Sequence, residues 1–404
     1  MPQAYFNVTH EHKKPLTLES AIIVNMVDSW SAVHNTTVTK LNPASNTVVL
    51  DDGKELTYKA LVLAPGFDSK VDNIPGLKGF DEGPENNNTY AHCIDNFSRA
   101  ARNFYNGYYS RGGDLVTYSP AYPYKGEGTD FYSLYYESFL RQDKMLEIVP
   151  AGSRVVHITP NKTIMPMPYA NEVVLDECHK RGIEVMFGWE MTSIQEDEQG
   201  NKTMTLRNVD TGEVVEKDYT GACINPTSKP HQWLVDAGVT DAMGMVDVNK
   251  YTLQHNKYDN IFAFGDCISG DLTRTMSAVI SAAPVVKNNV LQYVHGKEPN
   301  GVWDGFSQQI LHLGTRQTTV FSHKHDFEPT TMNHWAPHYG PLSAFYARLA
   351  ARQQLNAGIA YLDHKKNHGA PYGSFPQRFD ELEHNEYLAS KGIDANEVRF
   401  GGEK

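Results

Sequence analysis

Two short runs combine an apolar strand with residue types that could contact a ligand. Residues 260–267 (NIFAFGDC) place Gly265 and Asp266 directly after an apolar run, and residues 59–66 (KALVLAPG) end in Pro65 and Gly66. Glycine lets a backbone approach a ligand closely, and a carboxylate accepts hydrogen bonds from ligand hydroxyls. Each run therefore predicts a strand that ends in a ligand-binding turn. For Asp266 we favour the other interpretation, an N-cap of a helix that follows directly.

A phosphate-binding turn is missing from the sequence. No G-x-G-x-x-G follows a predicted strand, residues 1–33 contain no glycine, and no Walker loop, G-x-S-x-G or H-E-x-x-H motif occurs. Glycine-rich turns ahead of a helix hold pyrophosphate through backbone N–H groups and the helix dipole. The sequence therefore predicts no cradle for the pyrophosphate of a dinucleotide.

Composition narrows the class of protein. The chain has 404 residues, of which 40% are hydrophobic and 21% charged, enough for two or three folded domains. A net charge of -12 argues against binding to nucleic acid or to anionic membranes in general. No apolar run is long enough to span a membrane, and we expect no signal peptide.

Cysteines and histidines do not form a recognisable metal pattern. The four cysteines lie far apart without a C-x-x-C, which excludes a zinc motif and a disulfide framework and favours a reducing compartment: Cys93, Cys178, Cys223 and Cys267. We expect the last three to be buried. The histidines around His323 and His325 have unspecific spacing, so we predict solvated side chains and no metal site.

Alternating patterns place these residues in an α/β protein. An antiparallel meander is predicted over 36–58, followed by strand and helix in alternation over 112–187, a β-ribbon over 203–219 and a return strand at 222–224. A helix is predicted over 274–294 with a kink or break at Pro284, then strands around 309–321 and an amphipathic helix over 341–356. Tyrosine clusters over 105–136 fit either an interface or a sheet–helix layer.

This order of elements, with the segments 246–255 and 258–267, resembles the sulfide:quinone oxidoreductase family, and its mitochondrial branch in particular. The resemblance implies a glutathione-reductase-like architecture of two dinucleotide-binding, Rossmann-type domains, with the first βαβ unit absent and a helical C-terminal extension added. It implies a first, FAD-type domain over 1–98 and 223–325, a second domain over 99–222, and an amphipathic helix with a polar arm over 326–404.

The family's chemistry passes electrons from sulfide to a flavin through two cysteines. Matching the family's cysteine loops to this chain places Gly126 and Gln309 at the two cysteine positions. Neither side chain is a nucleophile or a redox group, so the resemblance implies that the sulfur relay is lost. Cys93, at the start of a predicted helix, is the one residual candidate for a reactive thiol.

These expectations lead to three hypotheses. The first is a catalytically inactive relative that binds no cofactor and serves as an accessory subunit of a mitochondrial, inner-membrane-associated assembly such as one of the respiratory chain. Other subunits would then cover the N-terminal region, and the helix over 341–356 would dock on protein or on the membrane surface. The second is an FAD-dependent oxidoreductase completed by another chain. The third, a module that holds a nucleotide in the second domain, has the weakest signal.

Overall fold

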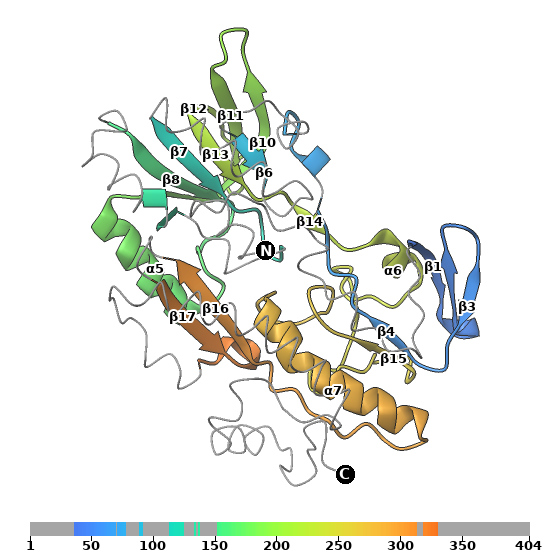
Figure 1. Cartoon of the computed structure of the whole chain (residues 1–404). Helices are drawn as coiled ribbons and strands as arrows, with labels where there is room; N and C mark the ends of the chain where they lie inside the picture. The colour runs from blue at the N-terminus through green and yellow to red at the C-terminus, as the bar shows by residue number, and fades with distance from the viewer. Residues whose placement is uncertain are drawn as a thin grey trace, which may run out of the picture.

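The computed structural model describes residues 36–69, 71–77, 89–91, 113–124, 133–134, 136–137, 152–312 and 318–329. Two α/β units lie side by side, with a β-hairpin between them (Figure 1). The predictions for Cys93, Gly126 and the helix over 341–356 lie outside the described residues. None of the described helices is long and apolar enough to cross a membrane.

The first unit begins with the predicted meander, formed by β1 (Val38–Asn42), β2 (Thr47–Leu50) and β3 (Glu55–Thr57). Its first turn, which contains the 3-10 segment Pro43–Ser45, ends at Asn46 with a φ of 52°, a left-handed conformation that asparagine tolerates well. The chain continues into β4 (Leu61–Leu63), which pairs in parallel with β15 (Ile261–Ala263) although about 200 residues separate them along the sequence.

The second unit contains a five-stranded parallel sheet in the order β6-β13-β7-β8-β9. Its strands are Thr89–Ala91, Gly221–Ile224, Asp114–Tyr118, Arg154–Thr159 and Glu184–Phe187 in that order. The predicted second domain covers 99–222, but β6 lies before residue 99 and β13 continues past residue 222, so this sheet extends beyond both predicted boundaries. Helix α5 (Pro168–Arg181) ends at Gly182, whose φ of 68° closes the helix as the sequence predicts.

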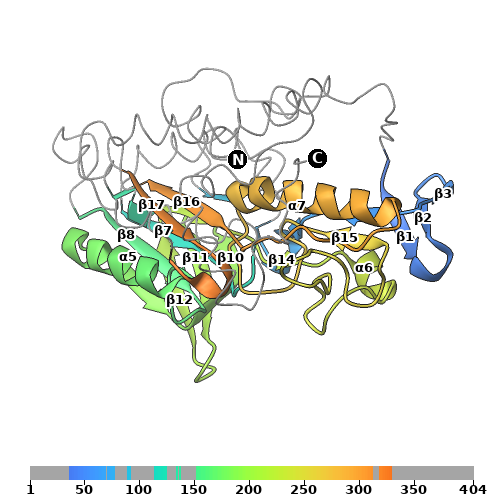
Figure 2. The same ribbon diagram turned by 90° about the horizontal axis from the view of Figure 1, so that it is seen from below.

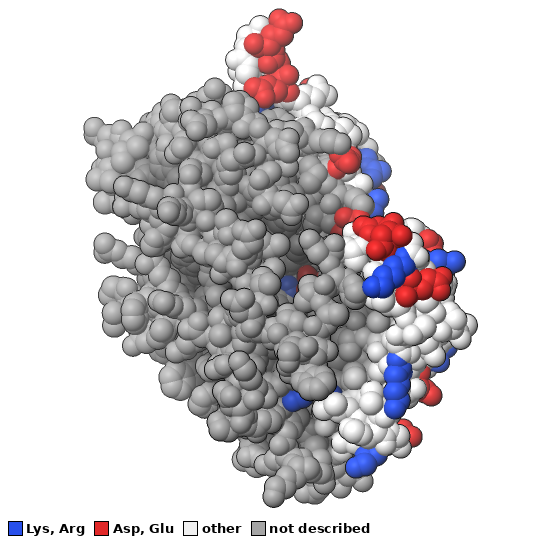
Figure 3. Space-filling model, turned by 45° about the vertical axis from the view of Figure 1, so that its right-hand side comes forward, with Lys and Arg blue, Asp and Glu red and all other residues white. Residues whose placement is uncertain are grey.

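A second, antiparallel sheet extends the predicted ribbon to three strands: β10 (Trp189–Glu196), β11 (Lys202–Asn208) and β12 (Val214–Tyr219). The extra strand β10 follows β9 through Gly188, whose φ is 77°. Side chains of both sheets share one core that includes Val116, Met191 and Leu206. Figure 3 shows acidic side chains at the tip of a projecting hairpin, and the turn between β10 and β11 exposes Glu196, Asp197 and Glu198.

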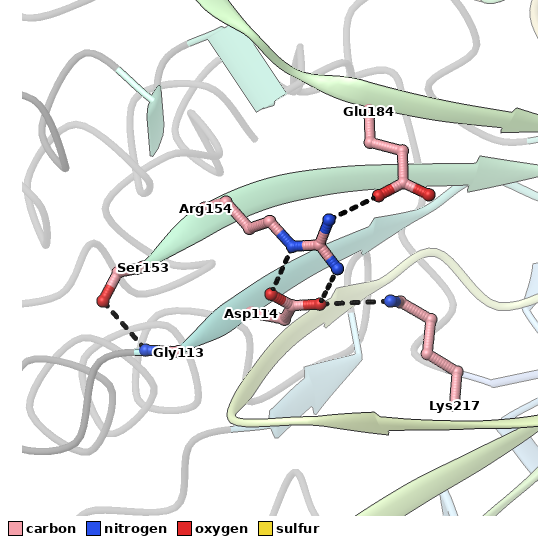
Figure 4. Close-up of polar contacts among 6 residues, drawn as sticks. All are labelled: Gly113, Asp114, Ser153, Arg154, Glu184 and Lys217. Atoms are coloured by element: carbon pink, nitrogen blue, oxygen red, sulfur yellow. Dashed lines mark hydrogen bonds and ion pairs between the residues drawn. The ribbon is translucent and has the colours of Figure 1, made fainter. Parts of the chain in front are cut away.

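Charged residues start three neighbouring strands of the parallel sheet and hold them together (Figure 4). The guanidinium of Arg154 in β8 donates from Nε and Nη2 to the two carboxylate oxygens of Asp114 in β7, at 2.8 and 3.0 Å, and from Nη1 to Glu184 in β9. Lys217 in β12 reaches Asp114 at 3.1 Å and so joins the two sheets. Ligands of open α/β sheets bind beyond the carboxyl ends of the strands, so this network at the amino ends is structural.

The remaining elements connect the two units. Strands β5 (Asp68–Ser69) and β14 (Ser228–Lys229) pair with each other, α6 (Gln232–Asp236) follows β14, and 3-10 turns occur at Val71–Asn73 and His325–Phe327. The hairpin consists of β16 (Ser307–His312) and β17 (Thr318–His323), close to the predicted strands. In the first unit, Phe262, Val285 and Trp303 are among the buried residues of a single core.

Helix α7 (Met276–Val294) continues through Pro284, so of the predicted kink or break the break is excluded. Proline removes one backbone hydrogen bond from a helix interior. Here the buried residues Ala282, Val285 and Val286 pack in the core, and Ser281 on the preceding turn bonds to the carbonyl of Phe306 at 2.7 Å. Tertiary packing on this scale outweighs the local preference.

Candidate functional site

The structure brings the two predicted ligand-binding turns together. Because β4 and β15 are parallel neighbours, the turns after them lie at the same edge, and the Phe264 N–H donates to the carbonyl of Leu63 at 3.2 Å. Gly66 and Gly265 have φ values of 71° and 83°, so both positions use the conformational freedom of glycine. This edge is where a parallel α/β sheet binds its ligands.

Arg274 joins these two turns, and sequence reasoning missed it. Its guanidinium is buried and donates to the carbonyl oxygens of Asp266, Leu272 and Ile268 at 3.0, 3.4 and 3.4 Å. It also lies 5.3 Å from the ring centroid of Phe67, which follows Gly66, in a cation–π contact. Its one visible signal in the sequence is a lone arginine between the Gly-Asp pair and the following helix.

Asp266 is not the N-cap that we favoured. Helix α7 begins only at Met276, and the hydroxyl of Thr275 is the cap, accepting a hydrogen bond from the Ala278 N–H at 3.3 Å. The intervening residues follow an irregular path that Arg274 supports through three carbonyl groups. A capping role for Asp266 is therefore excluded, while a contact with a ligand hydroxyl is compatible with its place at the edge.

The described cysteines are buried, as predicted. The thiol of Cys267 donates to the carbonyls of Leu63 and Phe264, and burial raises its pKa to about 12. Burial likewise raises the pKa of Cys178 to about 12. A thiolate is the nucleophilic form of cysteine, so both side chains are inert at neutral pH.

Gln309 lies in β16 with its side chain fully buried, opposite Phe321 in β17. Neither its amide nitrogen nor its carbonyl oxygen has a hydrogen-bond partner. Two residues earlier on the same face, the Ser307 hydroxyl is 2.7 Å from the hydroxyls of both Thr273 and Thr275. Gln309 therefore sits next to a satisfied hydroxyl network without joining it.

His323 and His325 are buried, which corrects the prediction of solvated histidines. His323 Nε2 is 2.8 Å from the Thr273 hydroxyl, and His325 Nε2 is 3.0 Å from the carbonyl of Trp303. Burial lowers the pKa of each histidine to about 4, so both are neutral at physiological pH. Among the described residues there is no group of three or more side chains that could bind a metal ion.

In the second unit, the described turn after β7 is not a glycine-rich phosphate-binding turn. The turn after β7, residues 119–124 (SPAYPY), contains no glycine, and the rings of Tyr122 and Tyr124 stack with centroids 5.4 Å apart. Asn161 ties this turn to the end of β8 by donating to the carbonyl of Pro120 at 2.8 Å. Of the described tyrosines of the clusters, Tyr118, Tyr124 and Tyr136 are buried and Tyr122 is partly buried, as in a sheet–helix layer.

These residues fit a flavin only in part. The Gly265–Asp266 turn suits a hydroxylated chain, but Gln309, at the position that the resemblance gives to a relay cysteine, carries an amide, and Cys267 is held as a thiol. The described residues include no glycine-rich turn ahead of a helix that could hold pyrophosphate. We therefore derive no electron-transfer step for this chain.

Comparisons with known proteins agree with this architecture. No protein-family model matches the chain. Mitochondrial sulfide:quinone oxidoreductases of Dictyostelium discoideum and Mus musculus are 26% and 24% identical to it, over 72% and 78% of this chain. The alignments cover 62% of the Dictyostelium protein and 68% of the mouse protein, so the matched part of the chain corresponds to about two thirds of their length.

Two solved structures are similar. A chain in the Tetrahymena thermophila mitochondrial ATP synthase structure aligns with a TM-score of 0.75 and 27% identity, over 83% of this chain and 81% of that chain. The sulfide:quinone oxidoreductase of Aquifex aeolicus aligns with a TM-score of 0.62 over 88% of this chain and 79% of its own, but at 17% identity it supports the fold alone.

Fold and site together define an α/β protein with the architecture of the FAD/NAD(P)-binding oxidoreductases. In sequence as well as in fold, the chain is similar to the sulfide:quinone oxidoreductase family.

Proposed function

We propose that this protein is a catalytically inactive member of its family that serves as a structural subunit of a mitochondrial assembly. One observation carries the proposal. Gln309, in the position that the family resemblance gives to a cysteine, is fully buried, and its amide cannot act as a nucleophile or a redox group. The truncated first unit, the C-terminal helical extension and the peripheral membrane contact through residues 341–356 belong to the same proposal.

ATP synthase is the assembly that the structural likeness favours. The similar Tetrahymena chain is part of a mitochondrial F1Fo ATP synthase, and the alignment covers nearly equal shares of the two chains, 83% and 81%. Chains of similar length and fold at this level of identity support a similar structural setting. An association with the inner membrane would follow from that setting.

Isolation of the native assembly tests this function. We expect an affinity-tagged chain to migrate on native gels with ATP-hydrolysing complexes, and the purified complex to show neither flavin absorbance nor sulfide-dependent reduction of quinone. A catalytic mitochondrial sulfide:quinone oxidoreductase, assayed in parallel, is the positive control. A reducible yellow cofactor in the purified complex would instead favour the oxidoreductase completed by another chain. A free monomer or homodimer with sulfide-dependent activity would overturn both the structural role and the inactivity.

A further inference from the structure

Strand β4 has an open edge. It pairs with β15 on one side, and β15 pairs on its other side with Gln254, while no strand within the described residues lies beyond β4. The Leu61 N–H donates to Asn260 at 2.9 Å and the Leu63 carbonyl accepts from Phe264 at 3.2 Å, so these residues face β15. In a parallel strand the backbone groups alternate in direction, so the N–H and C=O of Val62 face the open edge.

The side chain of Val62 is an exposed apolar group beside this edge. Val62 is registered with Phe262, so the two side chains lie on the same face of the sheet. Phe262 is fully buried there against Tyr293 of α7, with ring centroids 6.3 Å apart, whereas Val62 remains 41% exposed. Helix α7 runs alongside β15 (Figure 2), and Lys59 Nζ donates to the Val294 carbonyl at 2.8 Å, tying the end of α7 to the start of β4.

A comparison with β12 shows that the edge of β4 lacks the usual protection. Strand β12 is also an edge strand with an exposed valine, Val214 at 60%, but it carries Glu216, Lys217 and Asp218. Charged residues on an edge discourage pairing with other chains. The three residues of β4 are Leu, Val and Leu, without a charge or a proline.

We propose that the open edge of β4 is a docking site for an extended, apolar segment of another subunit. Backbone groups of that segment hydrogen-bond to the N–H and C=O of Val62, and one of its apolar side chains covers the exposed side chain of Val62. This inference rests on the proposed structural role. We take the occupant to be another subunit because the similar Tetrahymena chain is part of a multi-subunit structure. The alignment covers 83% of this chain and 81% of that one.

Hydrogen–deuterium exchange on the assembly and on the full chain released from it tests the docking site without any mutation. We expect the amide of Val62 to exchange at least about tenfold more slowly in the assembly. Equal exchange in an assembly that contains the chain would overturn the docking site and leave the proposed function intact. Failure to find the chain in any assembly would overturn the function itself. Slow exchange of the Val62 amide in the released monomer would show that this chain's own residues cover the edge. Slow exchange that develops as the concentration of the released chain rises would show that a second copy covers it. Either result overturns the proposal.

A pair of variants provides the second measurement. Val62→Lys should lower the amount of chain recovered in the assembly by about tenfold, because a charge beside the edge of β4 opposes docking of an apolar segment. Val214→Lys on the protected edge of β12 should leave recovery unchanged. Circular dichroism of both released chains reports whether they fold. Normal recovery of a folded Val62→Lys chain, or equal losses for both variants, would contradict the docking site.

Discussion

At the residue scale, Gln309 decides the interpretation of the site. A fully buried amide without partners is rare in native proteins, because each unsatisfied group loses its hydrogen bonds to water. Gln309 has two such groups, while the hydroxyl of Ser307, on the same face of β16, is satisfied by those of Thr273 and Thr275. The position therefore contributes little to stability, and nothing in its chemistry replaces a redox-active thiol.

Replacement of Gln309 by leucine should stabilise the protein by about 1 kcal/mol, because it removes two unsatisfied groups and keeps most of the buried volume. The midpoint of urea unfolding measures the change. Gln308→Leu is the matched control: this neighbouring side chain is also buried, but the residue has bonding partners, so no stabilisation is expected there. A clear loss of stability in Gln309→Leu would show that the amide meets a bound ligand or water.

At the element scale, the amino ends of the parallel strands of the second unit carry the structural charges, and the carboxyl ends of β4 and β15 in the first unit carry the candidate site. Asp114, Arg154 and Glu184 each start a strand, so pairing in register brings them side by side. The pKa of Asp114 is lowered. Partial burial of the carboxyl group raises this pKa, but the hydrogen bonds from Arg154 and Lys217 lower it by more. The carboxylate therefore stabilises the fold at neutral pH, and this contribution is lost as the pH falls through its lowered pKa.

Asp114→Asn should destabilise the protein by about 1 kcal/mol, because it breaks a bidentate pair with Arg154 and the link to Lys217. Glu190→Gln is the control, since the Glu190–Arg207 pair also joins two strands but has side chains 40% and 54% exposed. We expect the control to change stability by less than about 0.5 kcal/mol in urea unfolding. Equal effects of the two substitutions would contradict a special role for the network.

At the scale of the whole molecule, buried neutral histidines occur in both parts of the described fold. His157 lies in the centre of β8 in the second unit, with Nδ1 2.8 Å from the Thr117 hydroxyl, while His323 and His325 lie at the end of the hairpin beside the first unit. Burial lowers the pKa of His157 to about 3 and those of the other two to about 4. Acid should therefore weaken both units together.

Stability should fall as the pH drops below about 6.5, the ordinary pKa of histidine, and continue to fall to about pH 4. In this range the unfolded chain binds protons that the folded chain excludes, so each histidine contributes up to about 1.4 kcal/mol per pH unit. Unfolding midpoints in urea at a series of pH values measure the slope. His323→Gln should make it shallower, whereas a midpoint that does not change between neutral and mildly acidic pH would contradict the burial of all three side chains.

The sequence by itself determined the local elements and their order. The meander, the alternation of strands and helices around α5, and the hairpin follow from apolar periodicity and from turn residues such as Gly182 and Asn46, which act on their nearest neighbours. The sequence also marked Pro65, Gly66, Gly265 and Asp266 as residues of ligand-binding turns, whereas the meeting of the two turns at one sheet edge is a finding of the structure.

Only the tertiary structure decided features that depend on residues far apart in the chain. Burial of His323, the unbroken path of α7 through Pro284 and the contact of Arg274 with Phe67 are examples. None of them has a local signal, since burial and pairing are properties of surfaces that meet only after folding. The open edge of β4 belongs to this group as well, because the sequence of a strand does not show on which side it remains unpaired.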